Sequence, residues 1–269
     1  MCRVGEGSDA GSFLSKRIYG SLNMRFETYG SKQNKSIMFI HGMANDSSLF
    51  DEVIGYLPEY HVIVCVLDGH YANGQGEFIS IEDSCRQIER YVKNELGGSL
   101  DLLLGFSLGG AIATEMITRR KVNIGRTVLD AAFIIPMGPL GIFYTKLFQV
   151  SIWLVKAGVK MPDKLVGRVF GKGNTGVVDT VYRKVTVKNI GRECRAAFKY
   201  KIDPKISGYK NRVAFWHGSN EYFPAKSAKK LKRFLPQVKT TVYKDMGHGQ
   251  LIIEHPRAYA KRVRSFLEG

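Results

Sequence analysis

Cysteine is scarce in this chain of 269 residues. Its four cysteines are scattered, with no CxxC pair and no adjoining histidine cluster: Cys2, Cys65, Cys85 and Cys194. This spacing excludes a disulfide scaffold and the common zinc-binding motifs, so no metal site is expected. Cys65 and Cys85 stand in apolar or amphipathic stretches, where we expect buried free thiols.

Long hydrophobic runs are also missing. The first twenty residues lack the continuous apolar segment of a secretion signal, so we expect a reduced, cytoplasmic setting. The most apolar stretch, Phe133–Val155, is interrupted by Lys146. The uncharged residues 131–145 are fewer than the roughly 18 that a membrane-spanning helix needs, which argues against a span.

Acidic residues are few compared with basic ones, 24 against 40, and the formal net charge is +16. Residues 1–130 hold 13 basic and 16 acidic side chains, residues 131–210 hold 15 and 4, and residues 211–269 hold 12 and 4. The positive field of the middle and end of the chain could attract an anionic substrate or an anionic membrane surface. No nucleic-acid-binding motif accompanies it, so no nucleic-acid partner is expected.

Short apolar runs ending in turn residues alternate with helical patterns. The runs that predict strands are Ser36–Ile40, Val62–Leu67, Leu100–Leu104, one that begins at Thr127–Leu129, Val213–Trp216 and Val238–Tyr243. The helical patterns are Ser80–Leu96, Leu108–Thr118, Pro224–Leu235 and His255–Leu267. Lys16–Tyr19 and Asn23–Tyr29 are predicted to form an antiparallel pair before them. Continuous apolar strands alternating with helices indicate an α/β fold with a mostly parallel sheet.

A long insertion interrupts this alternation. Residues 131–206 separate the fourth and fifth of these strands, although a crossover needs only about a dozen residues. We therefore expect a core of residues 1–130 and 207–269 with an inserted helical cap at 131–206. The Leu, Phe and Trp side chains of Phe133–Val155 are expected to form the cap's own core, and they indicate a substrate with an apolar portion.

A candidate nucleophile stands where the third strand meets a helix. Gly105-Phe106-Ser107-Leu108-Gly109 contains the pattern G-x-S-x-G in a strand–turn–helix context. A sharp turn there strains the serine backbone, and the two glycines relieve the crowding. Ser107 also stands at a helix N-terminus, where negative charge is favoured.

A serine nucleophile needs a base, and His248 is the best placed of six histidines. It lies between Gly247 and Gly249, after the last strand and before the last helix. His70, in a loop, is the second choice. The other four begin or end predicted elements: His41, His61, His217 and His255.

The base needs an orienting acid, and two carboxyl groups compete for this role. Glu221 is the carboxylate in the turn after the strand ending at Trp216, 27 residues before His248. Asp130, at the end of the preceding strand, is the alternative acid.

Two backbone N–H groups are expected to form an oxyanion hole, those of Met43 and Leu108. Met43 follows the His41-Gly42 turn after the first parallel strand, and Leu108 follows Ser107. Removing one such donor typically raises the barrier by ~3 kcal/mol.

The order of these motifs, from His41-Gly42 through Ser107 and Glu221 to His248, resembles the α/β-hydrolase superfamily. Asp68-Gly69-His70 is similar to a D-x-G-H-G loop of that family, with Tyr71 in place of the second glycine. The resemblance implies an eight-stranded, mostly parallel sheet, a Ser–His–acid triad and a helical cap after strand six. The family usually has Asp at the acid position, where this chain has Glu221.

The residues and the resemblance together indicate a serine hydrolase of the esterase or lipase kind. Ser107 argues against epoxide hydrolases and haloalkane dehalogenases, which need a carboxylate nucleophile. We expect hydrolysis of a carboxylic ester with an apolar acyl group, through an acyl-enzyme and without a cofactor. The alternatives are an acyltransferase, a thioesterase or a C–C bond hydrolase on the same triad, a non-catalytic small-ligand receptor, and a basic binding module.

Overall fold

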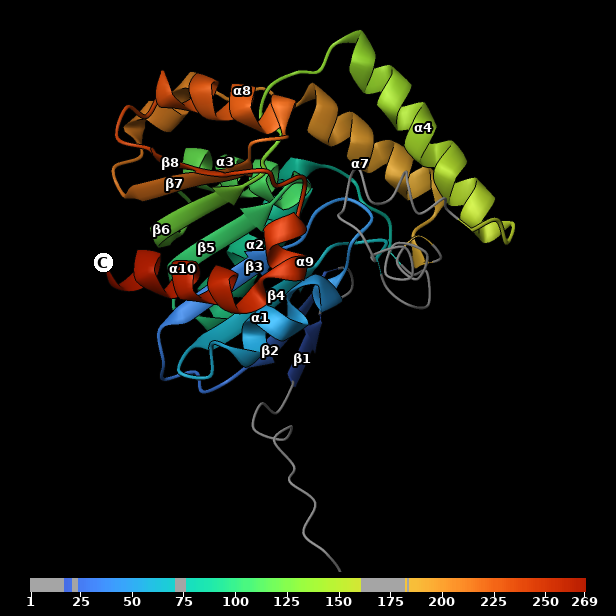
Figure 1. Cartoon of the computed structure of the whole chain (residues 1–269). Coiled ribbons are helices and arrows are strands. Elements are labelled where there is room, and N and C mark those ends of the chain that lie inside the picture. Colours follow the sequence, from blue (N-terminus) through green and yellow to red (C-terminus); the bar gives the residue numbers. More distant parts are fainter. Residues whose placement is uncertain (1–16, 21–23, 71–75, 161–181, 183) are drawn as a thin grey trace, which may run out of the picture.

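The computed structural model describes residues 17–20, 24–70, 76–160, 182 and 184–269. The eight strands of this described part of the chain form one sheet (Figure 1). In chain order they are β1 (Arg17–Gly20), β2 (Arg25–Tyr29), β3 (Ser36–Ile40), β4 (His61–Val66), β5 (Ser99–Phe106), β6 (Asn123–Asp130), β7 (Arg212–Gly218) and β8 (Lys239–Tyr243). The expected α/β class is confirmed.

The sheet has the strand order β1-β2-β4-β3-β5-β6-β7-β8. All pairs from β4 to β8 are parallel, whereas β2 runs antiparallel to both β1 and β4. In register, Ile40 is the neighbour of Gly105, and Asp130 is the neighbour of both Phe106 and Trp216. The carboxyl ends of these strands therefore meet at one edge, where open parallel sheets bind their ligands.

Helices cover both faces of the sheet. They are η1 (Ser47–Phe50), α1 (Asp51–Gly55), α2 (Ile81–Glu95), α3 (Leu108–Arg119), α4 (Pro139–Lys156), α7 (Val187–Lys199), η2 (Pro204–Gly208), α8 (Tyr222–Lys232), α9 (Gln250–Glu254) and α10 (Pro256–Glu268). The helical patterns predicted for α2, α3, α8 and α10 are confirmed within a few residues. The helices α1 and α9 were not expected, because five residues are too short to show a helical period.

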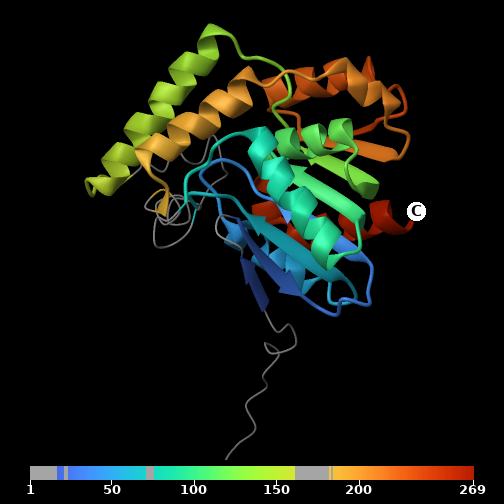
Figure 2. The same ribbon diagram turned by 180° about the vertical axis from the view of Figure 1, so that it is seen from behind.

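Alternate residues of the buried strands supply two hydrophobic cores. In β3, Met38 and Ile40 face the cluster beneath α2 and α3, while Ile37 and Phe39 face the cluster beneath α1 and α10. The helices α1 and α10 are in front in Figure 1, and α2 and α3 are in front in the reverse view of Figure 2. Burial on both faces is the reason why these strands are continuous apolar runs.

The 15-residue helix α2 shows how local sequence sets one element. Its buried face repeats at helical spacing through Ile81, Cys85, Ile88 and Val92. The side chain of Ser80, at the N-cap, accepts a hydrogen bond of 3.1 Å from the backbone N–H of Asp83. Capping and periodicity therefore agree on where this helix begins and which face it buries.

Two long helices lie between β6 and β7, at residues predicted to form a cap. The helices α4 and α7 pack against each other beside the sheet (Figure 1). Asn189 of α7 accepts a hydrogen bond of 3.2 Å from the backbone N–H of Phe78, so α7 is tied to the core. The expected cap also includes residues 161–181 and 183, which lie outside the described residues, and its boundaries stay a prediction.

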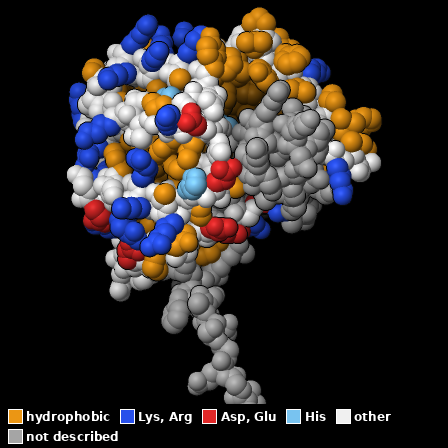
Figure 3. Space-filling model, viewed as in Figure 1, with side chains coloured by type: hydrophobic (Ala, Val, Ile, Leu, Met, Phe, Trp, Pro, Cys, Tyr) orange, Lys and Arg blue, Asp and Glu red, His pale blue; other side chains and the backbone are white. Residues whose placement is uncertain are grey.

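The outer surface of α4 corrects one expectation. Phe143 is 62% exposed and Trp153 is 61% exposed, although apolar side chains of this helix were expected to form a core. Figure 3 shows hydrophobic side chains gathered over α4 and Lys and Arg side chains over α8. The reason is geometric, because only one face of α4 packs against α7. No helix among the described residues is long and apolar enough to cross a bilayer.

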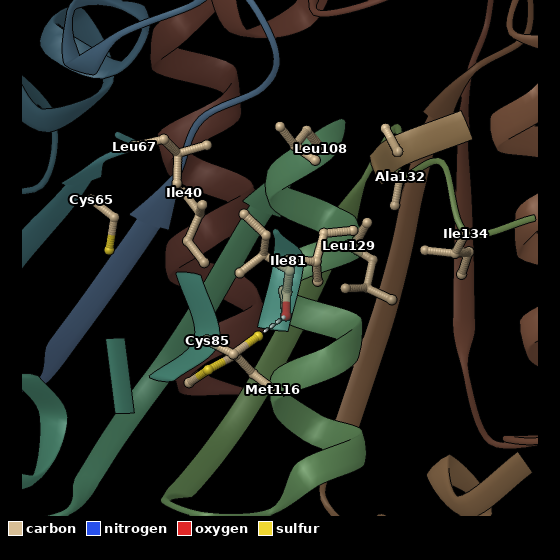
Figure 4. Close-up of a cluster of buried hydrophobic side chains, with 14 of the residues drawn as sticks. Ile40, Cys65, Leu67, Ile81, Cys85, Leu108, Met116, Leu129, Ala132 and Ile134 are labelled. Carbon is tan, nitrogen blue, oxygen red and sulfur yellow. Dashed lines mark hydrogen bonds between the residues drawn. The ribbon is translucent and has the colours of Figure 1, made fainter. Parts of the chain in front are cut away.

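The described cysteines are free and buried, as expected for Cys65 and Cys85. Figure 4 shows both within the cluster between the sheet and α3, where Cys85 donates to the backbone oxygen of Ile112 at 3.5 Å. Burial raises the pKa of the Cys85 thiol well above its ordinary value. A thiol held in its neutral form is a packing group rather than a nucleophile.

Candidate active site

Ser107 occupies the sharp turn between β5 and α3, with φ 55° and ψ −113°. The turn is tight enough that a Cβ on Gly105 would lie 2.1 Å from the backbone oxygen of Gly109. A Cβ on Gly109 would lie equally close to the backbone oxygen of Ile40. Both glycines of the G-x-S-x-G pattern are therefore required by contact with backbone, which no side-chain rotation could relieve.

The turn after β3 lies directly beside Ser107. A Cβ on Gly42 would stand 3.0 Å from the Cβ of Ser107. Met43, which follows Gly42, is half-buried, and Leu108 is the first residue of α3. The backbone N–H of a first helical residue has no acceptor within the helix, so that of Leu108 is free to serve an anion. The oxyanion role of Met43 and Leu108 stays a prediction.

His248 lies between Ser107 and Glu221. Its Nε2 atom is 3.0 Å from Oγ of Ser107, and its Nδ1 atom is 2.7 Å from Oε1 of Glu221. With Nδ1 protonated, the ring donates to the carboxylate and Nε2 accepts from the serine hydroxyl. The structure thus brings these three side chains together from the loops after β5, β7 and β8.

The second carboxylate oxygen of Glu221, Oε2, is also hydrogen-bonded. The backbone N–H of Gly218 donates to Oε2 at 2.5 Å, and the Glu221 side chain is 5% exposed. The backbone N–H of Asn220 donates at 3.1 Å to the oxygen of Met246, two residues before His248. The loop that carries the carboxylate and the loop that carries the imidazole are therefore bonded to each other, which sets their relative position.

Asp130, the alternative acid, has a different partner. Its Oδ2 atom accepts a hydrogen bond of 2.8 Å from the hydroxyl of Tyr259 on α10. Burial, together with the nearby charge of Glu221, raises the pKa of Asp130 to about 8, against the lowering effect of the Tyr259 bond. Its backbone oxygen accepts from the N–H of Ser107 at 2.8 Å. Asp130 therefore supports the turn of Ser107 through its backbone.

His70, the second choice as base, faces a different carboxyl group. Its Nε2 atom lies 3.3 Å from Oε2 of Glu193 on α7, and both side chains are fully buried. Its ring also meets that of His41 edge to face at 4.8 Å. The sequence offered no signal for the partner Glu193, which stands 123 residues further along the chain.

His41 is a structural residue. Its Nδ1 donates to the backbone oxygen of Gly42 at 2.8 Å, and its Nε2 accepts from the N–H of Leu67 at 3.0 Å. Burial, with the nearby His70, lowers the pKa of His41 to about 3, which keeps the ring neutral. The ring joins the turns after β3 and β4, which are neighbours at the carboxyl edge of the sheet.

Aromatic rings surround the imidazole of His248. The ring of Phe106 lies 4.8 Å from it and that of Phe133 lies 5.7 Å from it, between centroids. Phe133 in turn contacts Phe198 of α7 and Phe223 of α8. Sequence reasoning placed Phe133 in the apolar stretch but did not connect it with His248. Among the described residues, no group of three or more His, Cys, Asp and Glu side chains is arranged to hold a metal ion.

A serine hydroxyl, an imidazole and a buried carboxylate in one hydrogen-bonded line form the arrangement that activates a nucleophile for acyl transfer. A family model described as the alpha/beta hydrolase family matches residues 37–262. The chain belongs to the alpha/beta hydrolase family. The chain order of Ser107, Glu221 and His248 is typical of its members.

Two curated relatives match part of this alpha/beta hydrolase in sequence. A Haemophilus influenzae protein, provisionally named as a 2-succinyl-6-hydroxy-2,4-cyclohexadiene-1-carboxylate synthase, is 31% identical over 100 residues. That match covers 36% of this chain and 40% of the relative. A Gibberella zeae protein named as an AB hydrolase superfamily protein is 31% identical over 87 residues, which cover 32% of this chain and 31% of the relative.

Solved structures match over much more of the chain. A family member from Desulfitobacterium hafniense has a TM-score of 0.78 at 19% identity and covers 90% of this chain and 100% of its own. The carboxylesterase CesB from Bacillus subtilis has a TM-score of 0.74 at 16% identity, and the match covers 95% of this chain and 92% of CesB. At these identities the similarity establishes the alpha/beta hydrolase fold.

Proposed function

We propose that this chain hydrolyses carboxylic esters with an apolar acyl group through a Ser107 acyl-enzyme. The observation that carries the proposal is the line from Ser107 Oγ through His248 to Glu221, with its two distances of 3.0 Å and 2.7 Å. Each distance is within hydrogen-bond range, so the base can take the serine proton without a movement of the loops.

The steps follow from this geometry. Ser107 Oγ attacks the ester carbonyl while His248 Nε2 takes its proton, and Glu221 stabilises the resulting imidazolium. The N–H groups of Met43 and Leu108 hold the tetrahedral oxyanion. The C–O bond to the alcohol then breaks, and the alcohol leaves with the proton from His248. A water molecule, deprotonated by His248, attacks the acyl-enzyme and releases the acid and the serine.

The preference for an apolar acyl group rests on the rings around the base. Phe106 and Phe133 flank His248, and Phe133 contacts Phe198 from the insertion. We further propose that residues 131–206 act as a cap that supplies Phe133 and Phe198, while Phe106 comes from the end of β5. The hydrocarbon chain of an ester's acyl group would be removed from water by packing against these rings. Such burial is favourable in proportion to the apolar area that is buried.

The test is labelling with a fluorophosphonate probe, together with turnover of p-nitrophenyl esters of increasing chain length. Wild type should label and turn over, and Ser107→Ala should do neither. The matched control is Ser265→Ala, which removes an exposed serine of α10 and should label fully. Labelling that persists in Ser107→Ala would contradict the assignment. A wild type that neither labels nor turns over would favour the non-catalytic receptor.

Acyl transfer, thioester cleavage and C–C bond cleavage could use the same three side chains. Turnover of thioesters beside oxygen esters tests thioester cleavage, and product analysis with an added alcohol as acceptor tests acyl transfer. Ester hydrolysis is contradicted if the acyl group passes only to the acceptor.

A further inference from the structure

The outer side of α4 exposes an unusual amount of apolar surface. Seven of the twelve exposed large hydrophobic side chains among the described residues lie on this helix, each between 37% and 66% exposed. They are Leu140, Ile142, Phe143, Tyr144, Leu147, Val150 and Trp153, and we name them the α4 apolar face. A contiguous patch of this kind usually marks a surface that meets a partner.

The inner side of α4 already has its packing partner. Gly141, Thr145, Ile152 and Val155 are buried, and α4 packs against α7. A Cβ on Gly141 would lie 3.0 Å from the Cβ of Phe198, which shows how closely the helices approach. The α4 apolar face is therefore not needed to hold the helix in place. Because one side of this 18-residue helix packs against α7, the helix can lie on a membrane surface with its other side. It is not long and apolar enough to cross a membrane.

The charged side chains of α4 and of the residues just before and after it are all basic. No Asp or Glu occurs in residues 131–162, and Lys146, Lys156 and Lys160 are exposed. The helix α8 lies at the same edge of the molecule in Figures 1 and 2, and it exposes Lys226 and Lys229. Figure 3 shows Lys and Arg side chains over α8 and hydrophobic side chains over α4 on this side of the molecule.

We propose that the α4 apolar face docks on the surface of an anionic lipid bilayer. A bilayer offers apolar acyl chains directly beneath negative headgroups, which complements both the apolar side chains and the flanking lysines. Trp153 and Tyr144 have the amphipathic rings favoured at that depth. A second copy of the chain fits less well, because two such faces would bring like charges together in molecules of net charge +16.

The chain carries its own reporter for this contact. It has two tryptophans, of which Trp153 is 61% exposed on α4 and Trp216 is 4% exposed in the core of β7. Insertion of Trp153 among acyl chains shifts its emission to the blue, while that of Trp216 stays constant. Ser107→Ala protein is used, so that no lipid is hydrolysed and the result does not depend on the proposed activity.

The experiment titrates vesicles of phosphatidylcholine containing phosphatidylglycerol, and vesicles of phosphatidylcholine alone, with co-sedimentation as a second readout. We expect a blue shift with the anionic vesicles and binding roughly tenfold weaker to the neutral ones. In Ser107→Ala/Trp153→Phe protein the shift should vanish while co-sedimentation persists. Lys146→Gln with Lys156→Gln should weaken anionic binding and reduce its dependence on salt.

The apolar contribution is tested with matched exposed positions. Phe143→Ser with Leu147→Ser should weaken binding about tenfold or more, and Ile79→Ser with Val242→Ser, at exposed positions outside α4, should leave it unchanged. No binding to anionic vesicles, or equal losses in the two double variants, would overturn the proposal. So would a blue shift that grows with protein concentration in the absence of lipid, with a dimer in sedimentation velocity.

Discussion

The hydroxyl of Tyr259 donates a hydrogen bond of 2.8 Å to Oδ2 of Asp130. This bond directs the Asp130 carboxyl group toward α10, on the face of the sheet opposite α3. Nδ1 of His248 meets Glu221 instead, at 2.7 Å. Of the two acids that the sequence left in competition, the structure therefore pairs Glu221 with the imidazole.

The two carboxyl groups should respond differently to the same amide substitution. We expect Glu221→Gln to lower kcat/KM for a p-nitrophenyl ester by about a thousandfold or more, because the amide no longer stabilises the imidazolium. Asp130→Asn should change it by less than about threefold, since Asp130 does not contact His248. Steady-state kinetics measure both. A larger loss in Asp130→Asn than in Glu221→Gln would contradict the pairing.

Asp130 should also make stability depend on pH. Burial, with the charge of Glu221, raises its pKa to about 8 from an ordinary 3.8, so the folded chain holds a proton that the unfolded chain has released. Stability should therefore fall as the pH rises between these values, by up to about 1.4 kcal/mol per pH unit. Urea unfolding across this range should show a flatter profile in Asp130→Asn. An unchanged slope would contradict the raised pKa.

The buried pair of His70 and Glu193 should stabilise the chain mainly at lower pH. Burial alone lowers the pKa of His70, but the charge of the buried Glu193 carboxylate acts in the opposite direction, and the pKa is raised overall. The stabilisation is present below the ordinary histidine pKa of about 6.5 and is lost as the pH rises through the raised value. The deficit of Glu193→Gln against wild type should therefore shrink as the pH rises.

Glu77, which pairs with residues of α7, provides a control for the His70–Glu193 pair. Glu77 pairs with Lys188 and Arg192 of α7 but is exposed, so Glu77→Gln should have a small effect with no comparable change over that pH range. Chemical unfolding of both variants at several pH values makes the comparison. A Glu193→Gln deficit that stays constant or grows with pH would show that the pair is not charged in the folded chain.

The turn of Ser107 should tolerate no added side-chain atom. Gly109→Ala would place a Cβ 2.1 Å from the backbone oxygen of Ile40, and we expect destabilisation by about 3 kcal/mol or failure to fold. Gly55→Ala is the matched control, because a Cβ there meets nothing within 4 Å in the exposed part of α1. It should stabilise by about 0.5 kcal/mol. Thermal unfolding compares them, and equal effects would contradict the steric argument.

Sequence patterns predicted the parts of the site that depend on neighbours along the chain. The turn at Ser107 follows from five consecutive residues, and the strands follow from apolar runs bounded by turns. Parallel strands place their carboxyl ends together, so Glu221 and His248 could be assigned to the same edge as Ser107 before their contacts were known. Local conformation and strand direction are sufficient for such assignments.

Other contacts depended on the packing of distant segments. The partner of Asp130 stands 129 residues away on α10. The partner of His70 is the buried Glu193 on α7, and no local sequence pattern distinguishes it from glutamates that lie on the surface. The exposure of α4 was mispredicted for the same reason. An apolar helix can bury every face only if neighbours surround it, and α4 packs against α7 on one side.

The sequence by itself thus determined the α/β class, the turn that holds Ser107 and the strand ends that carry its partners. Only the tertiary structure decided which acid meets His248, which ring stands beside it and which face of α4 stays open. The physical reason is the range of the interactions. Backbone turns and hydrophobic periodicity act over a few residues, whereas hydrogen bonds and side-chain packing select partners by distance in space.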